Sequence, residues 1–131
     1  MKKLYFLFMT FIFVGYCENS VNVEVPSIES HEWKLISFGY TKMAVPQDAF
    51  IGLKDGRYFG NAGCNGMGGK YILKGKEIQF KTGMLTMMAC PDMSLEAKFT
   101  TALQSVDSYE IKDKTLVLLH DMHPVLNFIK K

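Results

Sequence analysis

From residue 31 to residue 129, short runs of aromatic and β-branched residues alternate with turn residues. Such runs predict strands, because these side chains pack well on a pleated surface. The clearest turn is Asp55-Gly56, where glycine tolerates the positive φ that a two-residue hairpin loop requires. We therefore expect an antiparallel meander or barrel-like sheet of about eight short strands. The candidate segments are 31–39, 49–53, 57–60, 70–73, 77–80, 84–88, 108–112, 115–119 and 125–129.

One segment has helical rather than strand periodicity. After Pro91, apolar residues recur at the three- and four-residue spacing of a helix face up to Val106. Asp92 or Ser94 can cap the helix start, and Glu96 places negative charge near its positive end. We expect one helix over about 92–105 packed on the sheet, which gives a β-rich α+β fold. The run 115–119 is apolar on both faces, which predicts a central strand covered on both sides.

The N-terminus has the pattern of an export signal. Lys2 and Lys3 precede an apolar run over 4–14, which is too short to span a bilayer. The stretch Val14-Gly15-Tyr16-Cys17 resembles a bacterial lipobox, in which the cysteine thiol receives a diacylglycerol and cleavage follows on its N-terminal side. We expect a signal peptide over 1–16, a lipid-anchored tether over 17–30 and a folded domain over 31–131. This predicts a bacterial cell-envelope protein held at a membrane by its N-terminal lipid.

Composition limits the remaining classes. With 131 residues, 48% of them hydrophobic and 21% charged, the chain fits one folded domain and not a disordered segment. Without Lys2 and Lys3, 13 basic residues face 13 acidic ones. A net charge of zero gives no electrostatic case for binding nucleic acid or an anionic membrane surface. We expect a monomer.

Two motifs carry a recognisable family pattern. The first runs from Gly60 to Tyr71 around a Gly-Cys-Asn core, and the second is Thr86-x-x-Ala89-Cys90-Pro91, which leads into the expected helix. Together with an opening Trp33-x-Leu35, they resemble the META (HslJ-like) domain family over about residues 31 to 129. The positions that match are Trp33, Gly60, Gly63, Asn65, Gly69, Tyr71, Thr86, Ala89 and Pro91. The resemblance implies a small β-rich fold with one helix, often exported, and a disulfide between the two motif cysteines.

Cysteine usage points to the same disulfide. Three cysteines in an exported chain leave one unpaired unless one of them is the lipid acceptor. With Cys17 acylated, Cys64 and Cys90 remain as a pair. A redox or metal pair is the alternative, but no Cys-x-x-Cys spacing and no nearby histidine accompany them.

Three other patterns have a functional and a structural interpretation. The glycines between 60 and 69 do not form a phosphate loop, because a strand and not a helix follows, so we expect tight turns, bulges and close backbone approach. His120, Asp121 and His123 offer metal ligands, but their place between two strands before Pro124 favours a solvated hairpin turn. Four methionines offer soft copper ligands, but core filling is the better interpretation. They are Met84, Met87, Met88 and Met93.

No catalytic set is apparent in the sequence. His31 lies near the tether, the other two histidines share one turn, and no serine has the context of a nucleophile elbow. We expect no metal and no cofactor. The expected function is that of a non-catalytic envelope lipoprotein with a stress-related, binding or structural role. Two alternatives remain open: a ligand- or protein-binding module such as an inhibitor of an external enzyme, and a hydrolase or metal/redox protein with converging titratable groups.

Overall fold

The computed structural model describes residues 27–41, 44–45 and 48–131. The expected signal peptide, Cys17 and most of the expected tether lie outside these residues. The described chain folds into the following elements: η1 (Ile28–Ser30), β1 (Glu32–Phe38), β2 (Phe50–Lys54), β3 (Arg57–Asn61), β4 (Gly66–Lys74), β5 (Glu77–Phe80), β6 (Met84–Leu85), α1 (Ser94–Ser105), β7 (Ser108–Lys112), β8 (Thr115–His120) and β9 (His123–Lys130).

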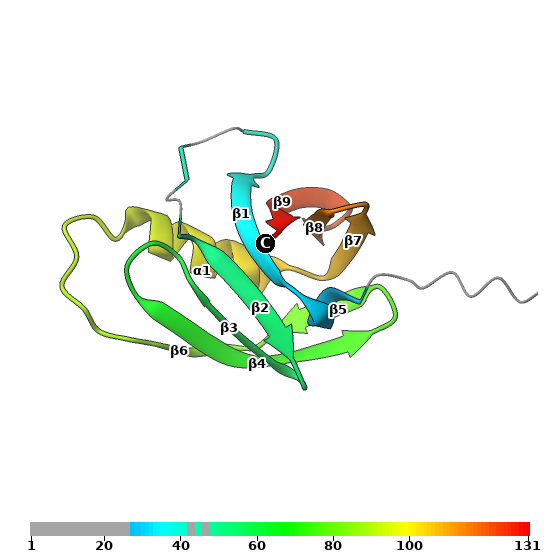
Figure 1. Ribbon diagram of the computed structural model, residues 1–131, viewed down its shortest axis with the longest axis horizontal. Coiled ribbons are helices and arrows are strands. Elements are labelled where there is room, and N and C mark those ends of the chain that lie inside the picture. Colours follow the sequence, from blue (N-terminus) through cyan, green and yellow to red (C-terminus); the bar gives the residue numbers. More distant parts are fainter. Residues whose placement is uncertain (1–26, 42–43, 46–47) are drawn as a thin grey trace, which may run out of the picture.

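The strands form one antiparallel sheet that closes on itself. Their order is β3-β2-β1-β9-β8-β7-β5-β4-β6, and a further pairing of β3 with β4 closes the sheet into a ring, with the short β6 attached to β4 (Figure 1). The weakest link is between β5 and β7, which share the single pair Glu77 and Ser108. A sheet of mostly consecutive antiparallel hairpins confirms the expected β-rich α+β fold.

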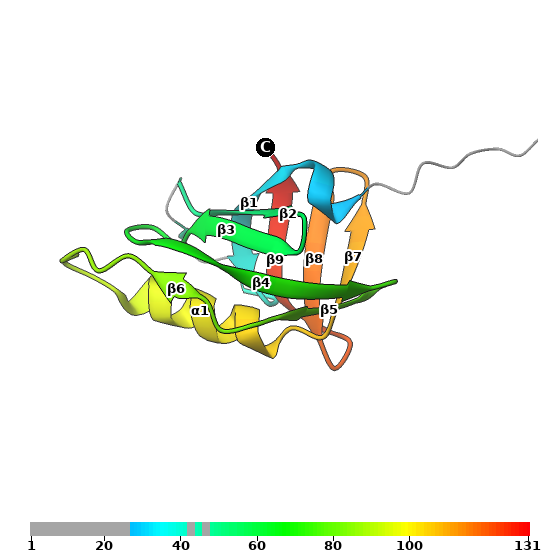
Figure 2. The same cartoon turned by 90° about the horizontal axis from the view of Figure 1, so that it is seen from below.

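Helix α1 packs against β5 and β9 and lies along the lower edge of the molecule in Figure 2. Its buried face consists of Glu96, Phe99 and Leu103. The Phe99 ring meets Phe128 of β9 edge-on, with centroids 6.2 Å apart. The helix therefore contributes large apolar side chains to the core that the ring of strands encloses. It begins at Ser94, whose backbone N–H donates to the Asp92 carboxylate at 2.9 Å, so Asp92 supports the helix start as expected.

The folded part begins before the expected domain boundary at residue 31. Ile28 is only 1% exposed, and its carbonyl accepts a hydrogen bond from the Trp33 indole at 2.9 Å. η1 contacts β2, and Ser27 caps it by accepting from the N–H of Glu29. Residues 27–30 are thus part of the domain, because Ile28 gains more from burial beside Trp33 than from exposure in a tether.

Three strand predictions need correction. β4 begins at Gly66, so Gly66, Gly68 and Gly69 lie in a strand and not in turns, although the expected close approach is found at Gly69, where the Tyr58 ring lies against the backbone. The segment expected as a strand over 84–88 pairs with β4 only at Met84 and Leu85. In β8, Leu116, Leu118 and Leu119 are buried while Val117 is only half-buried, so the strand is not fully covered on both faces.

Candidate functional site

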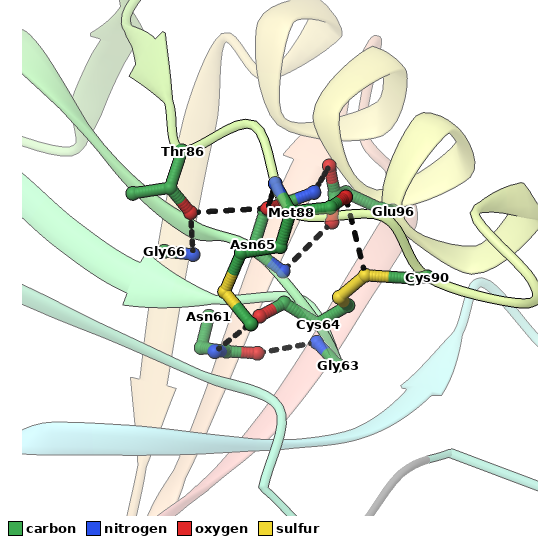
Figure 3. Close-up of a disulfide and its surroundings, with 9 residues drawn as sticks. All are labelled: Asn61, Gly63, Cys64, Asn65, Gly66, Thr86, Met88, Cys90 and Glu96. Carbon is green, nitrogen blue, oxygen red and sulfur yellow. Dashed lines mark hydrogen bonds between the residues drawn. A yellow bond between two sulfur atoms is a disulfide. The ribbon is translucent and has the colours of Figure 1, made fainter.

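The two sequence motifs meet at one end of the sheet, beside the start of α1. The loop after β3 carries Cys64 and Asn65, and the segment after β6 carries Thr86 and Cys90. A disulfide joins Cys64 to Cys90, as expected, with their Cα atoms 6.4 Å apart. We call this assembly the clasp; it comprises the disulfide, Asn65, Thr86, the backbone of Met88, and Glu96 (Figure 3).

Asn65 is the centre of the clasp and is 1% exposed. Its side-chain amide donates to Glu96 Oε1 at 3.1 Å. Its side-chain oxygen accepts from the backbone N–H of Met88 at 2.8 Å and from the Thr86 hydroxyl at 3.1 Å. One asparagine therefore connects the second motif to the helix, and Figure 3 shows these contacts radiating from it.

Glu96 is a buried acid, 4% exposed, and it forms no ion pair with a cationic side chain of the described residues. Both carboxylate oxygens are instead occupied by Asn65, Oε1 by the side-chain amide and Oε2 by the backbone N–H at 3.0 Å. A buried carboxylate is costly unless hydrogen bonds compensate for lost water. The sequence placed Glu96 near the helix start as a favourable charge but gave no sign of this partnership, because it depends on a contact across 31 positions.

Thr86 completes the link between the motifs. Its hydroxyl accepts from the N–H of Gly66 at 3.0 Å, and its own N–H donates to the carbonyl of Gly66 at 2.9 Å. Within the first motif, Asn61 accepts from the N–H of Gly63, whose φ of 125° suits glycine. The clasp thus satisfies its polar groups internally, and no buried side-chain nitrogen or oxygen of the described residues lacks a partner.

The remaining motif positions serve the fold. Trp33 is buried, and a Cβ at Gly69 would lie 2.7 Å from the Tyr58 ring, so glycine makes room for that ring. The Tyr71 hydroxyl donates to Glu29, and burial together with this bond raises the pKa of Tyr71 to about 12. A Cβ at Gly60 would collide with the carbonyl of Phe50.

Ala89 and Pro91, the last two motif positions, are exposed on either side of Cys90. They border a recess of about 460 Å³ between the disulfide and the start of α1.

An open cleft of about 880 Å³ lies beside the clasp. Its walls are β3, the first half of β4 and the segment from Lys81 to Thr86. Apolar side chains and glycines line most of it, while Arg57, Lys70 and Lys81 supply positive charge.

The four methionines expected in the core are on the surface, so that interpretation was wrong. Met87 is 96% and Met84 is 83% exposed, and Met88 and Met93 are also exposed. The physical reason is that β6 is only two residues long and the chain from 86 to 93 runs outside the ring, away from the enclosed core.

The histidine-rich turn is solvated, in agreement with its expected structural role. Asp121 and Met122 have positive φ between β8 and β9, and His120, Asp121 and His123 are exposed. His120 lies near two carboxylates, 3.3 Å from Asp107 and 3.5 Å from Asp121. The pKa of Asp107 is lowered, chiefly by the backbone N–H of Asp121 and then by the Ser108 hydroxyl. His123 is not part of this group.

The closed antiparallel ring and the clasp define a small disulfide-linked β domain with one helix. The sequence profile of the META domain matches residues 26–131, so the chain belongs to the META domain family. This confirms the resemblance seen in the motifs. In the described part of the chain, no helix has the length and apolar character needed to cross a membrane.

Solved structures with the same fold include two of known source. An NMR structure of a protein from Burkholderia xenovorans has a TM-score of 0.67 and 26% identity, covering 79% of this chain and 83% of that one. A crystal structure of a DUF4847 family protein from Bacteroides vulgatus has a TM-score of 0.60 and 16% identity, covering 78% of this chain and 93% of that one, which bears on the fold alone. No curated protein matches the chain.

Proposed function

We propose that the protein is a non-catalytic META domain protein of the bacterial cell envelope, anchored to a membrane through a lipid on Cys17. The observation that carries the non-catalytic role is the clasp. Its polar side chains are the motif groups best suited to chemistry, yet they bond to one another. A catalytic group must instead reach substrate or a water molecule.

The histidines support the same proposal. His31 stacks edge-on against Trp33, 6.0 Å away, and His120 lies in an exposed turn with two acids. In the ranges that the structure describes, no histidine forms a hydrogen bond with a serine or cysteine. A binding role is favoured by the open cleft beside the clasp, whose mostly apolar walls and few charged groups are typical of ligand sites.

The anchoring is tested by mass spectrometry of the protein expressed in a Gram-negative bacterium. We expect a mature N-terminus at an acylated Cys17. We also expect Cys17→Ser to release the protein from the membrane fraction, because this variant cannot be acylated and stable anchoring needs several acyl chains. An intact Met1, or a soluble product with unmodified Cys17, would remove the lipid anchor from the proposal.

A further inference from the structure

Four cations lie side by side across the outside of the sheet. In the β2–β3 hairpin Lys54 pairs with Arg57, and in the β3–β4 pair Arg57 lies opposite Lys70. The N–H of Lys81 donates to the carbonyl of Lys70 at 2.9 Å, which places Lys81 next in line. Directly opposed residues of an antiparallel sheet point to the same face. We call these four residues the cationic row, which is ~14 Å long at the usual strand spacing.

The charges of the cationic row are not balanced. Like charges directly opposite each other destabilise a sheet. None of the four forms an ion pair with an acid among residues 27–41, 44–45 and 48–131. Lys81 bonds only to the neutral Gln79, at 2.7 Å. Asp55, in the turn between Lys54 and Arg57, is exposed and unpaired as well. These cations can therefore interact with negative charge from outside the domain.

An apolar row lies next to the cationic row on the same face. Two positions further along β3, Phe59 lies opposite Gly68, which pairs in turn with Met84 of β6. Phe59 is 44% and Met84 is 83% exposed, and both line the open cleft together with Lys70. The face therefore combines a line of cations with protruding apolar side chains, the combination that binds at the boundary between headgroups and acyl chains.

We propose that this face docks on anionic phospholipid headgroups of the membrane that carries the protein. The proposal rests on the lipid anchor proposed above, which brings the domain to a membrane. Charge complementarity between the cationic row and anionic headgroups identifies the face that docks. Cys17 and Ser27 are ten positions apart in the sequence, a reach of up to ~33 Å. The described chain begins at η1, which contacts β2, the strand that ends at Lys54 of the cationic row. A tether of this length holds the face close to headgroups at high effective concentration.

Vesicle binding tests this face independently of the anchor. The chain from residue 17 with Cys17→Ser, which cannot be acylated, is sedimented with vesicles of phosphatidylglycerol and phosphatidylcholine and with vesicles of phosphatidylcholine alone. We expect binding to the anionic vesicles that weakens as salt is raised. Each cation near an anionic surface contributes a roughly fivefold gain in partitioning. We therefore expect the triple substitution Lys54→Glu, Lys70→Glu and Lys81→Glu, the row variant, to reduce binding to anionic vesicles more than tenfold.

The matched control reverses three cations elsewhere in the ring: Lys112→Glu and Lys114→Glu at the β7–β8 turn and Lys130→Glu on β9. The net charge changes equally, and we expect these substitutions to reduce binding less than threefold. Circular dichroism melts establish that both variants fold. If the row variant does not fold, Met84→Ser replaces it, and we expect this loss of a protruding apolar side chain to weaken vesicle binding about threefold or more with the charge unchanged.

Three results would overturn the docking proposal: no binding to anionic vesicles, equal binding to neutral ones, or equal losses in the row and control variants. Binding to soluble polyphosphate at salt concentrations where vesicles are already released would assign the row to a soluble polyanion and would also overturn it. Because the vesicle assay uses an unacylated chain, its outcome does not depend on whether Cys17 is lipidated in cells.

Discussion

Replacing Asn65 with alanine removes the centre of the clasp while leaving the disulfide in place. The substitution deletes a donor to Glu96 and an acceptor for Met88 and Thr86. Thr86 is exposed and can bond to water in part, so losing this bond costs no more than the ~1 kcal/mol of an ordinary hydrogen bond. Glu96 is buried, and one of its oxygens would lose its donor, at a cost of ~1–3 kcal/mol or more for a charged group. With ~1 kcal/mol for each of the other two bonds, we expect a destabilisation of about 3–5 kcal/mol.

The assay is reversible denaturant or thermal unfolding under oxidising conditions. At ~4 °C per kcal/mol for a domain of about this size, the expected loss lowers the melting temperature by about 12–20 °C. Gln79→Ala is the control, because this exposed amide bonds only to Lys81 and its loss should stay within ~0.5 kcal/mol. A cycle with Glu96→Ala should be non-additive, with the double variant less destabilised than the sum by about 1–3 kcal/mol. A loss below about 1 kcal/mol for Asn65→Ala would refute this reasoning.

Three further predictions follow from the same geometry. Cys64→Ser should lower the free energy of unfolding by about 3.5 kcal/mol, the loop entropy of a disulfide that spans 26 residues, and Cys90→Ser should lower it equally in denaturant unfolding. Unequal or negligible losses would contradict a stabilising Cys64–Cys90 disulfide. Burial raises the pKa of Tyr71 from 10.0 to about 12, so the folded state keeps a proton that the unfolded chain releases. The contribution of Tyr71 to stability is therefore full below about pH 10 and is lost as the pH rises through about 12. Tyr71→Phe should remove the last tyrosinate absorbance step in a pH titration. His120→Ala and His123→Ala should change the melting temperature by no more than a few degrees, because both side chains are exposed in a turn, and any envelope phenotype should persist; its loss in a well-folded variant would contradict the non-catalytic proposal.

Local signals predicted the elements well where they depend on neighbours in sequence. The Asp55-Gly56 turn fixed the β2–β3 hairpin, and Asp55 indeed has a φ of 50° beside Gly56 at 75°. The helix was found from its apolar spacing, and its start differs by two residues. The methionines were misplaced because apolar character alone does not tell whether a segment faces the enclosed core. Here the chain leaves the sheet after Leu85.

The contacts of the clasp depend on which distant segments lie side by side, and the sequence alone does not show how its strands pair. Asn65 was recognised as a family position and Glu96 as a favourable charge near the helix start, but their mutual bonding requires the first motif to lie beside the start of α1. The net charge of the chain does not reveal the cationic row, for a related reason. A net charge of zero averages over the whole chain, whereas pairing of β3 with β4 places Arg57 against Lys70.

The central claim is that the family motif forms an internal clasp, and amide hydrogen exchange tests it most directly. The Met88 N–H lies in an exposed segment but donates to the buried Asn65, whereas the neighbouring Met87 N–H donates to no described residue. We expect the Met88 and Asn65 amides to exchange orders of magnitude more slowly than the Met87 amide, at rates approaching those of the β8 and β9 core. Exchange of the Met88 amide as fast as that of Met87 would contradict the clasp.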